Sequence, residues 1–340
     1  MDAPVSPPDC LTPRFPAVAT RAGHYESIYL VASHPSAPVS VWIRYTVHKQ
    51  PGRRPTGSIW FTLFEDGRPT AVKVTDDDVR AGTGSQLLAV GGYGAVRRDG
   101  ATGAVSGRHT DASWALRFEP LDAELRHLPY GWLYRAPLPR TKSTSPYPAM
   151  RVSGSVVLNG RELTLDGWRG MLGHNWGAEH AHRWIWLRGA GFAEAPEGWL
   201  DVVIGRVKVG PSTTPWIANG AFAPDGRKGR RHRIGGLLRR ITVQERPDGC
   251  DLVLPGDGMT LTVTVTAPIA TSVGWEYADP SGGRHQVRNC STAGLAVRIG
   301  RGHASPGGTP EELHTAHGGV YELGSATFDP SVAMQPYTDG

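Results

Sequence analysis

The stretch VSVWIRYTVH, residues 39–48, alternates between two kinds of side chain. One face of an extended strand would carry Val39, Val41, Ile43, Tyr45 and Val47. The other face would carry Ser40, Trp42, Arg44, Thr46 and His48. A period of two residues indicates a β-strand, because successive side chains point to opposite sides of a sheet. The stretch therefore predicts a strand with two chemically distinct faces.

Similar strands recur on both sides of this one. Residues 59–64, IWFTLF, are apolar on both faces, so we expect both sides of that strand to be covered. Residues 114–119 alternate apolar and polar side chains, and residues 260–266 alternate Thr with Leu or Val, which is typical of half-solvated strands. Asn159-Gly160, between SVVL and RELTL, predicts a two-residue hairpin. With almost no helical periodicity, this pattern predicts an all-β fold of antiparallel barrels or sandwiches.

The length of 340 residues is sufficient for two domains, each with its own core. Residues 137–149, PLPRTKSTSPYPA, contain four prolines and predict an extended connector. The hairpin that follows would close the first unit. We therefore expect a boundary near Gly170, within about ten residues, which divides the chain into residues 1–170 and 171–340. The halves show no sequence repeat, although a repeat of fold remains compatible with them.

The net charge of +5 is concentrated in one run, RKGRRHRIGGLLRR, which begins at Arg227 and ends at Arg240. A solvated loop is the simplest interpretation, and peripheral contact with a membrane surface, an acidic head group or a phosphate is the alternative. No nucleic-acid recognition motif accompanies the run, so we expect no nucleic-acid partner. The sequence does not indicate the oligomeric state.

The three cysteines, Cys10, Cys250 and Cys290, are odd in number and widely spaced. They fit neither a disulfide framework nor a zinc site, which favours a reducing compartment. Residues 1–16 lack the basic and apolar regions of a signal peptide. No apolar run approaches the roughly 20 residues that span a bilayer. We therefore expect a cytoplasmic protein.

Residues 166–188, DGWRGMLGHNWGAEHAHRWIWLR, concentrate Trp, His and Gly, and we expect residues 173–188 to form a wall that touches a ligand. Convergent aromatic and polar groups are typical of a pocket for a hydrophobic small molecule. The candidate catalytic residues are His174, Glu179 and Asp201. The candidate ligand-binding residues are Glu26, Trp42, Arg44, Asn175, Trp176, Trp184 and Trp186, with Tyr321 and Glu322 as weaker candidates.

Structural roles compete with these functional ones. His174 could be a hydrogen-bonded core residue, Asn175 could cap a turn, and each Trp could belong to a plain barrel core. If Arg44 points inward it needs a carboxylate partner, for which Glu26 is the candidate. His180 and His182 would share a face of a strand, but no third ligand is evident at suitable spacing, so we expect no metal site.

The motif GHNWG at residues 173–177 resembles the HNWG-type motif of a lipocalin-like superfamily. That superfamily contains bacterial carotenoid hydratases, tocopherol cyclases and AttH-like proteins, and some natural-product Diels–Alderases share its architecture. GHYESIYLVA (residues 23–32), VWIRYTVHKQPGRRPTGSIWFTLFE (residues 41–65) and VYELG (residues 320–324) are similar to its opening, second and closing strands. The resemblance spans most of the chain.

The resemblance implies two lipocalin-like barrels in tandem, little helix and a ligand cavity near their junction. It also implies non-redox chemistry without an organic cofactor: hydration of an alkene, proton-started cyclisation, or pericyclic closure. The first two need a shielded acid beside an aromatic wall, and Glu179, Asp201 and Glu26 are the carboxyl groups available. We expect a cofactor-independent enzyme that hydrates, cyclises or isomerises a polyene, isoprenoid or polyketide. The alternative is a non-catalytic lipid- or terpenoid-binding protein.

Overall fold

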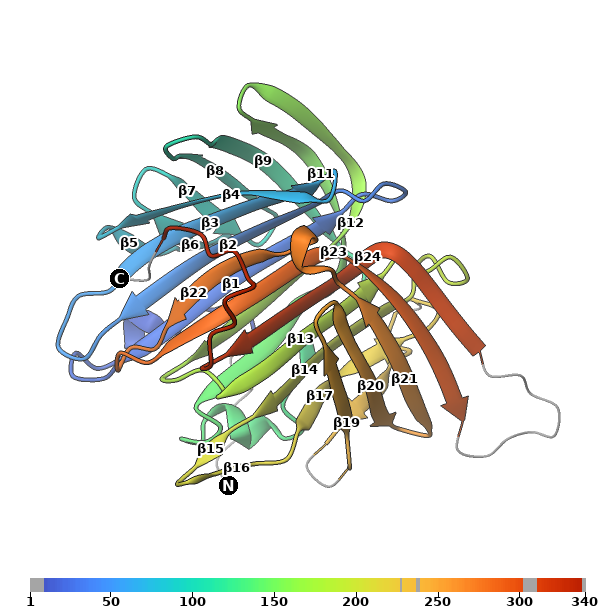
Figure 1. Cartoon of the computed structure of the whole chain (residues 1–340). Helices are drawn as coiled ribbons and strands as arrows, with labels where there is room; N and C mark the ends of the chain where they lie inside the picture. The colour runs from blue at the N-terminus through green and yellow to red at the C-terminus, as the bar shows by residue number, and fades with distance from the viewer. Residues whose placement is uncertain (1–8, 227, 237–238, 302–310, 338–340) are drawn as a thin grey trace.

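A computed structural model of the chain describes residues 9–226, 228–236, 239–301 and 311–337. Two large antiparallel sheets dominate it, and the described residues contain three short 3₁₀ helices and no α-helix (Figure 1). The expected all-β, two-barrel fold with little helix is therefore confirmed. None of the described helical segments has the length and apolar character needed to cross a bilayer.

The first sheet holds the strands of the N-terminal half. These are β1 (His24–Ser33), β2 (Ser40–Lys49), β3 (Thr56–Glu65), β4 (Arg68–Asp76), β5 (Val79–Ala81), β6 (Gln86–Val90), β7 (Gly94–Arg97), β8 (Gly100–Ser106), β9 (Asp111–Pro120), β10 (Leu125–Arg126), β11 (Thr141–Leu158) and β12 (Arg161–Gly177). The 3₁₀ helices η1 and η2 span Phe15–Ala17 and Gly131–Tyr134.

The second sheet holds the strands of the C-terminal half. These are β13 (Arg183–Ala190), β14 (Trp199–Arg206), β17 (Ile217–Ala223), β18 (His232–Gly235), β19 (Thr242–Arg246), β20 (Gly249–Gly256), β21 (Met259–Thr266), β22 (Val273–Ala278), β23 (Arg284–Arg301) and β24 (Glu311–Ser325). A small separate ribbon joins β15 (Lys208–Val209) to β16 (Ser212–Thr213), and η3 spans Ile269–Thr271.

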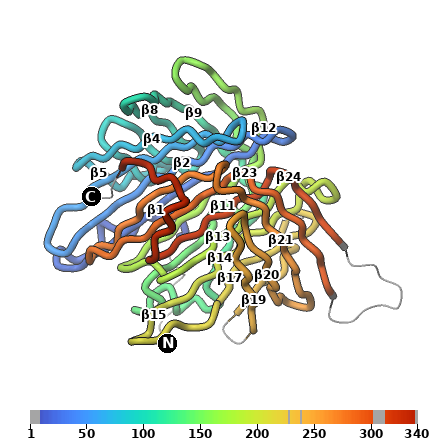
Figure 2. Tube along the Cα trace, in the orientation of Figure 1, coloured from blue at the N-terminus to red at the C-terminus, as the bar shows by residue number. Residues whose placement is uncertain are grey.

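The two sheets share one plan of connection. In the first, β1 pairs with both β2 and β12, so the first strand lies beside the last. In the second, β13 pairs with both β14 and β24 in the same way. A pairing between β18 and β20 closes the second barrel, whereas the first is nearly closed. Figure 2 traces the chain from the first unit, in blue to green, to the second, in green to red. The halves therefore repeat a topology without repeating a sequence.

Both faces of β2 are buried, and each belongs to a different core. Val41, Ile43 and Tyr45 pack inside the first barrel. Trp42 packs in a separate cluster that joins the two barrels. The neighbouring strand β3 behaves in the same way, which confirms the prediction that IWFTLF is covered on both sides.

The prediction of an extended connector at residues 137–149 is wrong over most of its length, because Thr141–Leu158 forms the long strand β11. Pro146 and Pro148 cannot donate a hydrogen bond to a neighbouring strand. The register of β11 against β12 shifts between Thr144 and Tyr147, and again between Tyr147 and Met150. These irregularities place the prolines where ladder bonds are already interrupted, which is how a strand tolerates proline.

The predicted hairpin at Asn159-Gly160 is confirmed. Both residues have positive φ, at 49° and 81°, and Leu158 pairs directly with Arg161 across the turn. That backbone matches the two-residue turn that Asn-Gly favours. The chain then leaves the first sheet after Gly177 and enters the second at Arg183. Residues 178–182 therefore connect the barrels.

Candidate functional site

The barrels meet through a closely packed aromatic wall, and Figure 1 shows β1 and β2 of the first barrel beside β22 and β23 of the second. The first barrel contributes the outer faces of β1, β2, β3 and β12, and the second contributes β13, β22, β23 and β24. The buried members of this junction wall are Tyr29, Val31, Trp42, Trp60, Phe64, Met171, Trp184, Trp186, Val273, Trp275, Tyr277, Val287 and Val320.

The segment expected to form the wall divides between two places. Trp184 and Trp186 belong to the junction wall. His174 and Trp176 lie on the opposite face of β12, with Leu172, which packs inside the first barrel. Alternation along the strand therefore separates the two groups of candidates.

The HNWG-type motif belongs to a polar cluster at one end of the first barrel. Nε2 of His174 lies 2.8 Å from Oε1 of Glu26, and Nδ1 lies 2.6 Å from the carbonyl oxygen of Cys10. Both partners can accept hydrogen bonds, so His174 links the Glu26 carboxylate to the N-terminal segment. The ring of Trp176 lies 4.7 Å from that of His174. His174 and Trp176 thus contact the N-terminal segment, whereas Asn175 shares the junction-side face of β12 with Met171.

Glu26 attaches the N-terminal segment to the barrel. Its carboxylate accepts hydrogen bonds from the backbone amides of Arg14, at 2.7 and 3.0 Å, and Phe15, at 2.7 Å. Burial alone would raise the pKa of Glu26, but hydrogen bonds and charges from His174 and His24 lower it to about 2. Glu26 is therefore an ionised anchor and not a protonated acid.

Asp201 is the candidate carboxylate that lies at the junction. It is fully buried on the outer face of β14, and Oδ1 accepts a hydrogen bond from Nε1 of Trp186 at 3.0 Å. Oδ2 accepts one from the hydroxyl of Ser145, which reaches across from the first barrel. Burial would raise the pKa of Asp201, but the charge of His127 and these hydrogen bonds together lower it below its ordinary value. Asp201 is therefore ionised.

His127 completes this network, and no sequence pattern pointed to it. Nδ1 lies 3.1 Å from the carbonyl oxygen of Asn219, which can only accept. Nε2 lies 3.1 Å from the hydroxyl oxygen of Ser145, whose proton is directed at Asp201, and 3.4 Å from Oδ2 of Asp201. The His127 ring thus contacts a carbonyl oxygen, a hydroxyl and a carboxylate. His127 and Asp201 form a buried pair bridged by the hydroxyl of Ser145.

Arg44 does not pair with Glu26. In the register of β1 with β2, Glu26 lies opposite Val47 and Arg44 lies opposite Tyr29, on the other face of the sheet. Nε of Arg44 instead donates to the hydroxyl of Ser27 at 2.7 Å. The guanidinium carbon lies 3.9 Å from the ring centroid of Tyr277 in the second barrel. Arg44 is thus a cation at the junction.

Glu322, a weaker candidate at the sequence level, accepts three hydrogen bonds on the junction side of β24. The donors are Nε1 of Trp184 at 3.1 Å, the hydroxyl of Tyr277 at 3.3 Å and Nδ2 of Asn289 at 3.2 Å. The junction therefore holds two buried carboxylates, one on each side of the Trp184–Trp186 strand.

Glu179 lies apart from these groups. Its side chain is 38% exposed, and it pairs with Arg140 on the surface. The next residue, His180, is enclosed: its Nδ1 lies 2.7 Å from Oδ1 of Asp279, and its ring stacks on Tyr25 at 3.9 Å. Burial lowers the pKa of His180 despite its hydrogen bond to Asp279.

Several buried polar atoms at the junction have no hydrogen-bond partner among the described residues. They are Nη1 of Arg44, Oδ1 of Asn175, Nε1 of Trp42 and Nε1 of Trp275. The ring centroids of Trp42 and Trp275 lie 6.2 Å apart. An unmet hydrogen bond in a buried site costs about 1–3 kcal/mol. These atoms are therefore available to a bound polar group.

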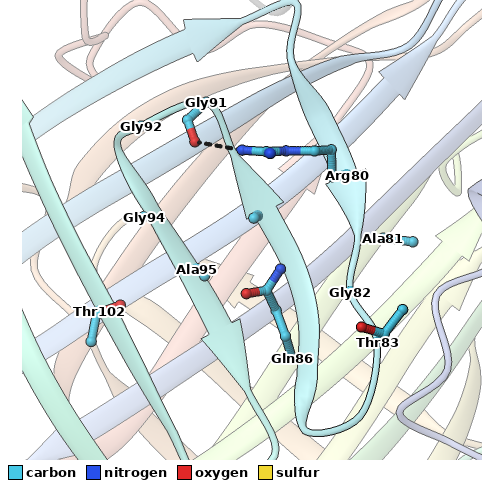
Figure 3. A pocket seen from close by; sticks show the side chains of 11 residues that line it. Arg80, Ala81, Gly82, Thr83, Gln86, Gly91, Gly92, Gly94, Ala95 and Thr102 are labelled. Atoms are coloured by element: carbon cyan, nitrogen blue, oxygen red, sulfur yellow. Dashed lines mark hydrogen bonds between the residues drawn. The ribbon is translucent and has the colours of Figure 1, made fainter.

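Two hollows lie elsewhere. The larger, of about 400 Å³, is open and polar on the outside of β5 to β8, where Arg80 donates a hydrogen bond to the carbonyl oxygen of Gly91 (Figure 3). The smaller, of about 10 Å³, lies between Ser33 and Arg169 of the first barrel and Gly318 of the second. It has room for about one water molecule.

Two arginines of the basic run connect the second barrel to the N-terminal half. Arg231 donates to the carbonyl oxygens of Ala123 and Glu124, and Arg233 donates to those of Arg126 and His127. Residues 227, 237 and 238 of the run, including Arg227, lie outside the described residues. Arg231 and Arg233 therefore bind backbone carbonyl groups of the N-terminal half.

Comparison with solved structures defines the class of fold. CghA, a Diels–Alderase solved with Sch210972, shares 12% identity over 91% of this chain and 90% of its own, with a TM-score of 0.56. Kievitone hydratase from Nectria haematococca shares 10% identity over the same fractions, with a TM-score of 0.52. An AttH-like protein from Nitrosomonas europaea shares 14% identity over 95% and 99% of the two chains, with a TM-score of 0.49.

The chain thus shares the two-barrel fold of kievitone hydratase and CghA, which is the fold that the sequence motifs implied. No family model matches the sequence, and no curated protein sequence matches it.

Proposed function

We propose that this protein is a cofactor-independent enzyme that hydrates, cyclises or isomerises a hydrophobic polyene, isoprenoid or polyketide at the barrel junction. The observation that carries the proposal is the set of unpartnered polar atoms in the aromatic wall, on Arg44, Asn175, Trp42 and Trp275. A largely apolar molecule with one or two oxygen atoms would satisfy them and bury its hydrocarbon against tryptophan. The fold shared with kievitone hydratase and CghA supports this class of chemistry.

Proton transfer is the chemistry that the junction favours. Asp201 is ionised, which suits the removal of a proton from carbon or water. The His127 imidazole, with Nε2 3.4 Å from the same carboxylate, is placed to return one. Arg44, with a free Nη1, suits stabilisation of negative charge on a substrate oxygen. An isomerisation or cyclisation begun by proton abstraction therefore fits better than protonation by a neutral carboxylic acid.

Binding at this place requires wall side chains to move, because they are buried and closely packed. The alternative function, a non-catalytic lipid or terpenoid carrier, would use the same wall without needing the Asp201 network. The three described cysteines are free thiols, which supports a cytoplasmic location. Peripheral membrane contact through the basic run remains a proposal for its exposed members, such as Arg230, whose side chain is 68% exposed.

The test compares Asp201→Asn with Asp257→Asn, a matched change in an exposed carboxylate that pairs with Arg239. Isoprenoid, polyene and polyketide compounds are screened for quenching of Trp emission and for conversion by mass spectrometry. Removal of a general base costs about 10²- to 10⁴-fold in rate, so Asp201→Asn should lose turnover and keep most of its affinity. Asp257→Asn should retain both.

Two results would reject the enzymatic proposal. One is binding by the native protein without conversion of any compound, which would favour the carrier. The other is equal turnover in native protein and Asp201→Asn.

A further inference from the structure

Three side chains that are distant in sequence meet at one end of the junction. His180 lies in the connector, Asp279 follows β22, and His285 lies near the start of β23. One ligand atom from each lies within 4.8 Å of the other two. Their side chains are 9%, 5% and 6% exposed, so the cluster is shielded from solvent.

The distances within this cluster suit a small cation. Nδ1 of His180 lies 2.7 Å from Oδ1 of Asp279, and Nε2 of His285 lies 3.0 Å from Oδ2. Ligand atoms about 2.0–2.1 Å from one zinc ion are about 2.9 Å apart at a right angle and about 3.3 Å apart in a tetrahedron. Both distances to Asp279 are therefore close to those of two ligands on one ion, and all three ligand atoms lie within 4.8 Å of one another.

The chemistry of the donors also fits. Two imidazoles and a carboxylate are ligands that zinc and its neighbouring divalent transition metals accept. The ring nitrogens that do not contact Asp279, Nε2 of His180 and Nδ1 of His285, are buried without a hydrogen-bond partner in the part of the chain that the structure describes. Since no other described group holds a proton on those nitrogens, either tautomer is open to each ring. Both rings can therefore present the required lone pair.

The residues around this cluster show which parts of the fold a bound ion would connect. Tyr25 of β1 stacks on the His180 ring. Trp184 also stacks on His180, with ring centroids 5.6 Å apart, and meets the His285 ring edge-on at 5.5 Å. The cluster thus links the first barrel, the connector and the β22–β23 hairpin. Three protein ligands would leave a coordination position for water or a substrate oxygen.

We propose that His180, Asp279 and His285 bind one divalent transition-metal ion, with zinc as the fitting probe. The site is independent of the proton-transfer proposal, because none of its residues belongs to the Asp201 network. His182 is the matched control, since it lies two residues from His180 in the same connector and outside the cluster.

The experiment uses the full chain after treatment with a chelator and dialysis. Zinc chloride is titrated by calorimetry, bound metal is counted by mass spectrometry, and cobalt(II) is added to follow its visible absorption. We expect one ion per chain and a rise in melting temperature. His285→Gln should weaken zinc binding by at least 10- to 100-fold, the loss that even outer-shell changes cause. His182→Gln should bind as the native protein does.

Asp279→Asn and His180→Gln provide second and third tests if His285→Gln fails to fold, and melting of each metal-free variant identifies those that are folded. A folded variant that has lost the ion and the cobalt spectrum supports the site. Absence of stoichiometric binding by the native chain overturns it. Unchanged binding in the folded cluster variants, or equal loss in His182→Gln, also overturns it, since binding would then lie at surface histidines.

Discussion

Replacement of Glu26 by Gln removes one charge from the anchor of the N-terminal segment and keeps its size. The pKa of Glu26 falls from 4.5 to about 2 on folding. A shift of one unit corresponds to about 1.36 kcal/mol, so the ionised form contributes roughly 3 kcal/mol at neutral pH. The side chain is only 1% exposed, so solvent screening reduces this figure little. We expect Glu26→Gln to lower the free energy of unfolding by about that amount at pH 7.

The pH dependence of this stability loss shows whether it comes from the charge of Glu26. Because folding depresses the pKa of Glu26, its contribution is complete above the unfolded value near 4.5 and is lost as pH falls through the folded value near 2. Linkage predicts that the difference in free energy of unfolding between native and variant protein falls by more than half by pH 3, where roughly 1.4 kcal/mol remains.

Urea denaturation at pH 7, 5, 4 and 3 measures the difference. Glu197→Gln is the control, because Glu197 is half-exposed and pairs with Arg151 on the surface. Such pairs contribute about 0–1 kcal/mol. A loss below about 1 kcal/mol for Glu26→Gln at pH 7, or the same loss at pH 7 and pH 3, would refute an ionised anchor.

Two further predictions concern neighbouring residues. Gly173→Ala should lower the melting temperature and reduce the free energy of unfolding by about 1–3 kcal/mol through overpacking, because a Cβ there would lie 2.6 Å from the hydroxyl oxygen of Tyr29. The same change in a Tyr29→Ala background should cost much less. An equal cost in both backgrounds would contradict the clash. Cys10 should react very slowly with a thiol reagent at pH 8, because burial raises its pKa to about 12. It should react faster in Glu26→Gln, and equal rates in both proteins would show that the segment stays attached.

The strands could be predicted from the local sequence, but which core each strand face packs against could not. Residues 39–48 have a clear period of two, and both faces of the resulting strand are buried. Which face meets the second barrel depends on pairing with segments far along the chain. The Arg44–Glu26 pair failed for this reason, since the register of β1 with β2 places the two on opposite faces.

The candidate site was predictable in part. A motif drew attention to His174 and Trp176, and the structure places both at the end of the first barrel. Asp201 was singled out for its closeness to the motif, and the structure places it at the junction. His127 carries no local signal, because its role depends on Ser145, which lies 18 residues away in the chain, and on Asp201, which lies 56 residues beyond Ser145.

The pairing of β1 with β12 makes formation of the first barrel depend on distant chain segments. Tyr25 pairs with Gly177, so one edge of β1 has no neighbour until about 150 further residues have been synthesised. At 5–20 residues per second this delay is roughly 8–30 seconds on the ribosome. Non-local pairings of this kind slow folding, and an open strand edge can recruit another chain. Chains truncated before β12 should therefore aggregate during synthesis, whereas chains that extend past Gly177 can complete the first barrel before the second is made.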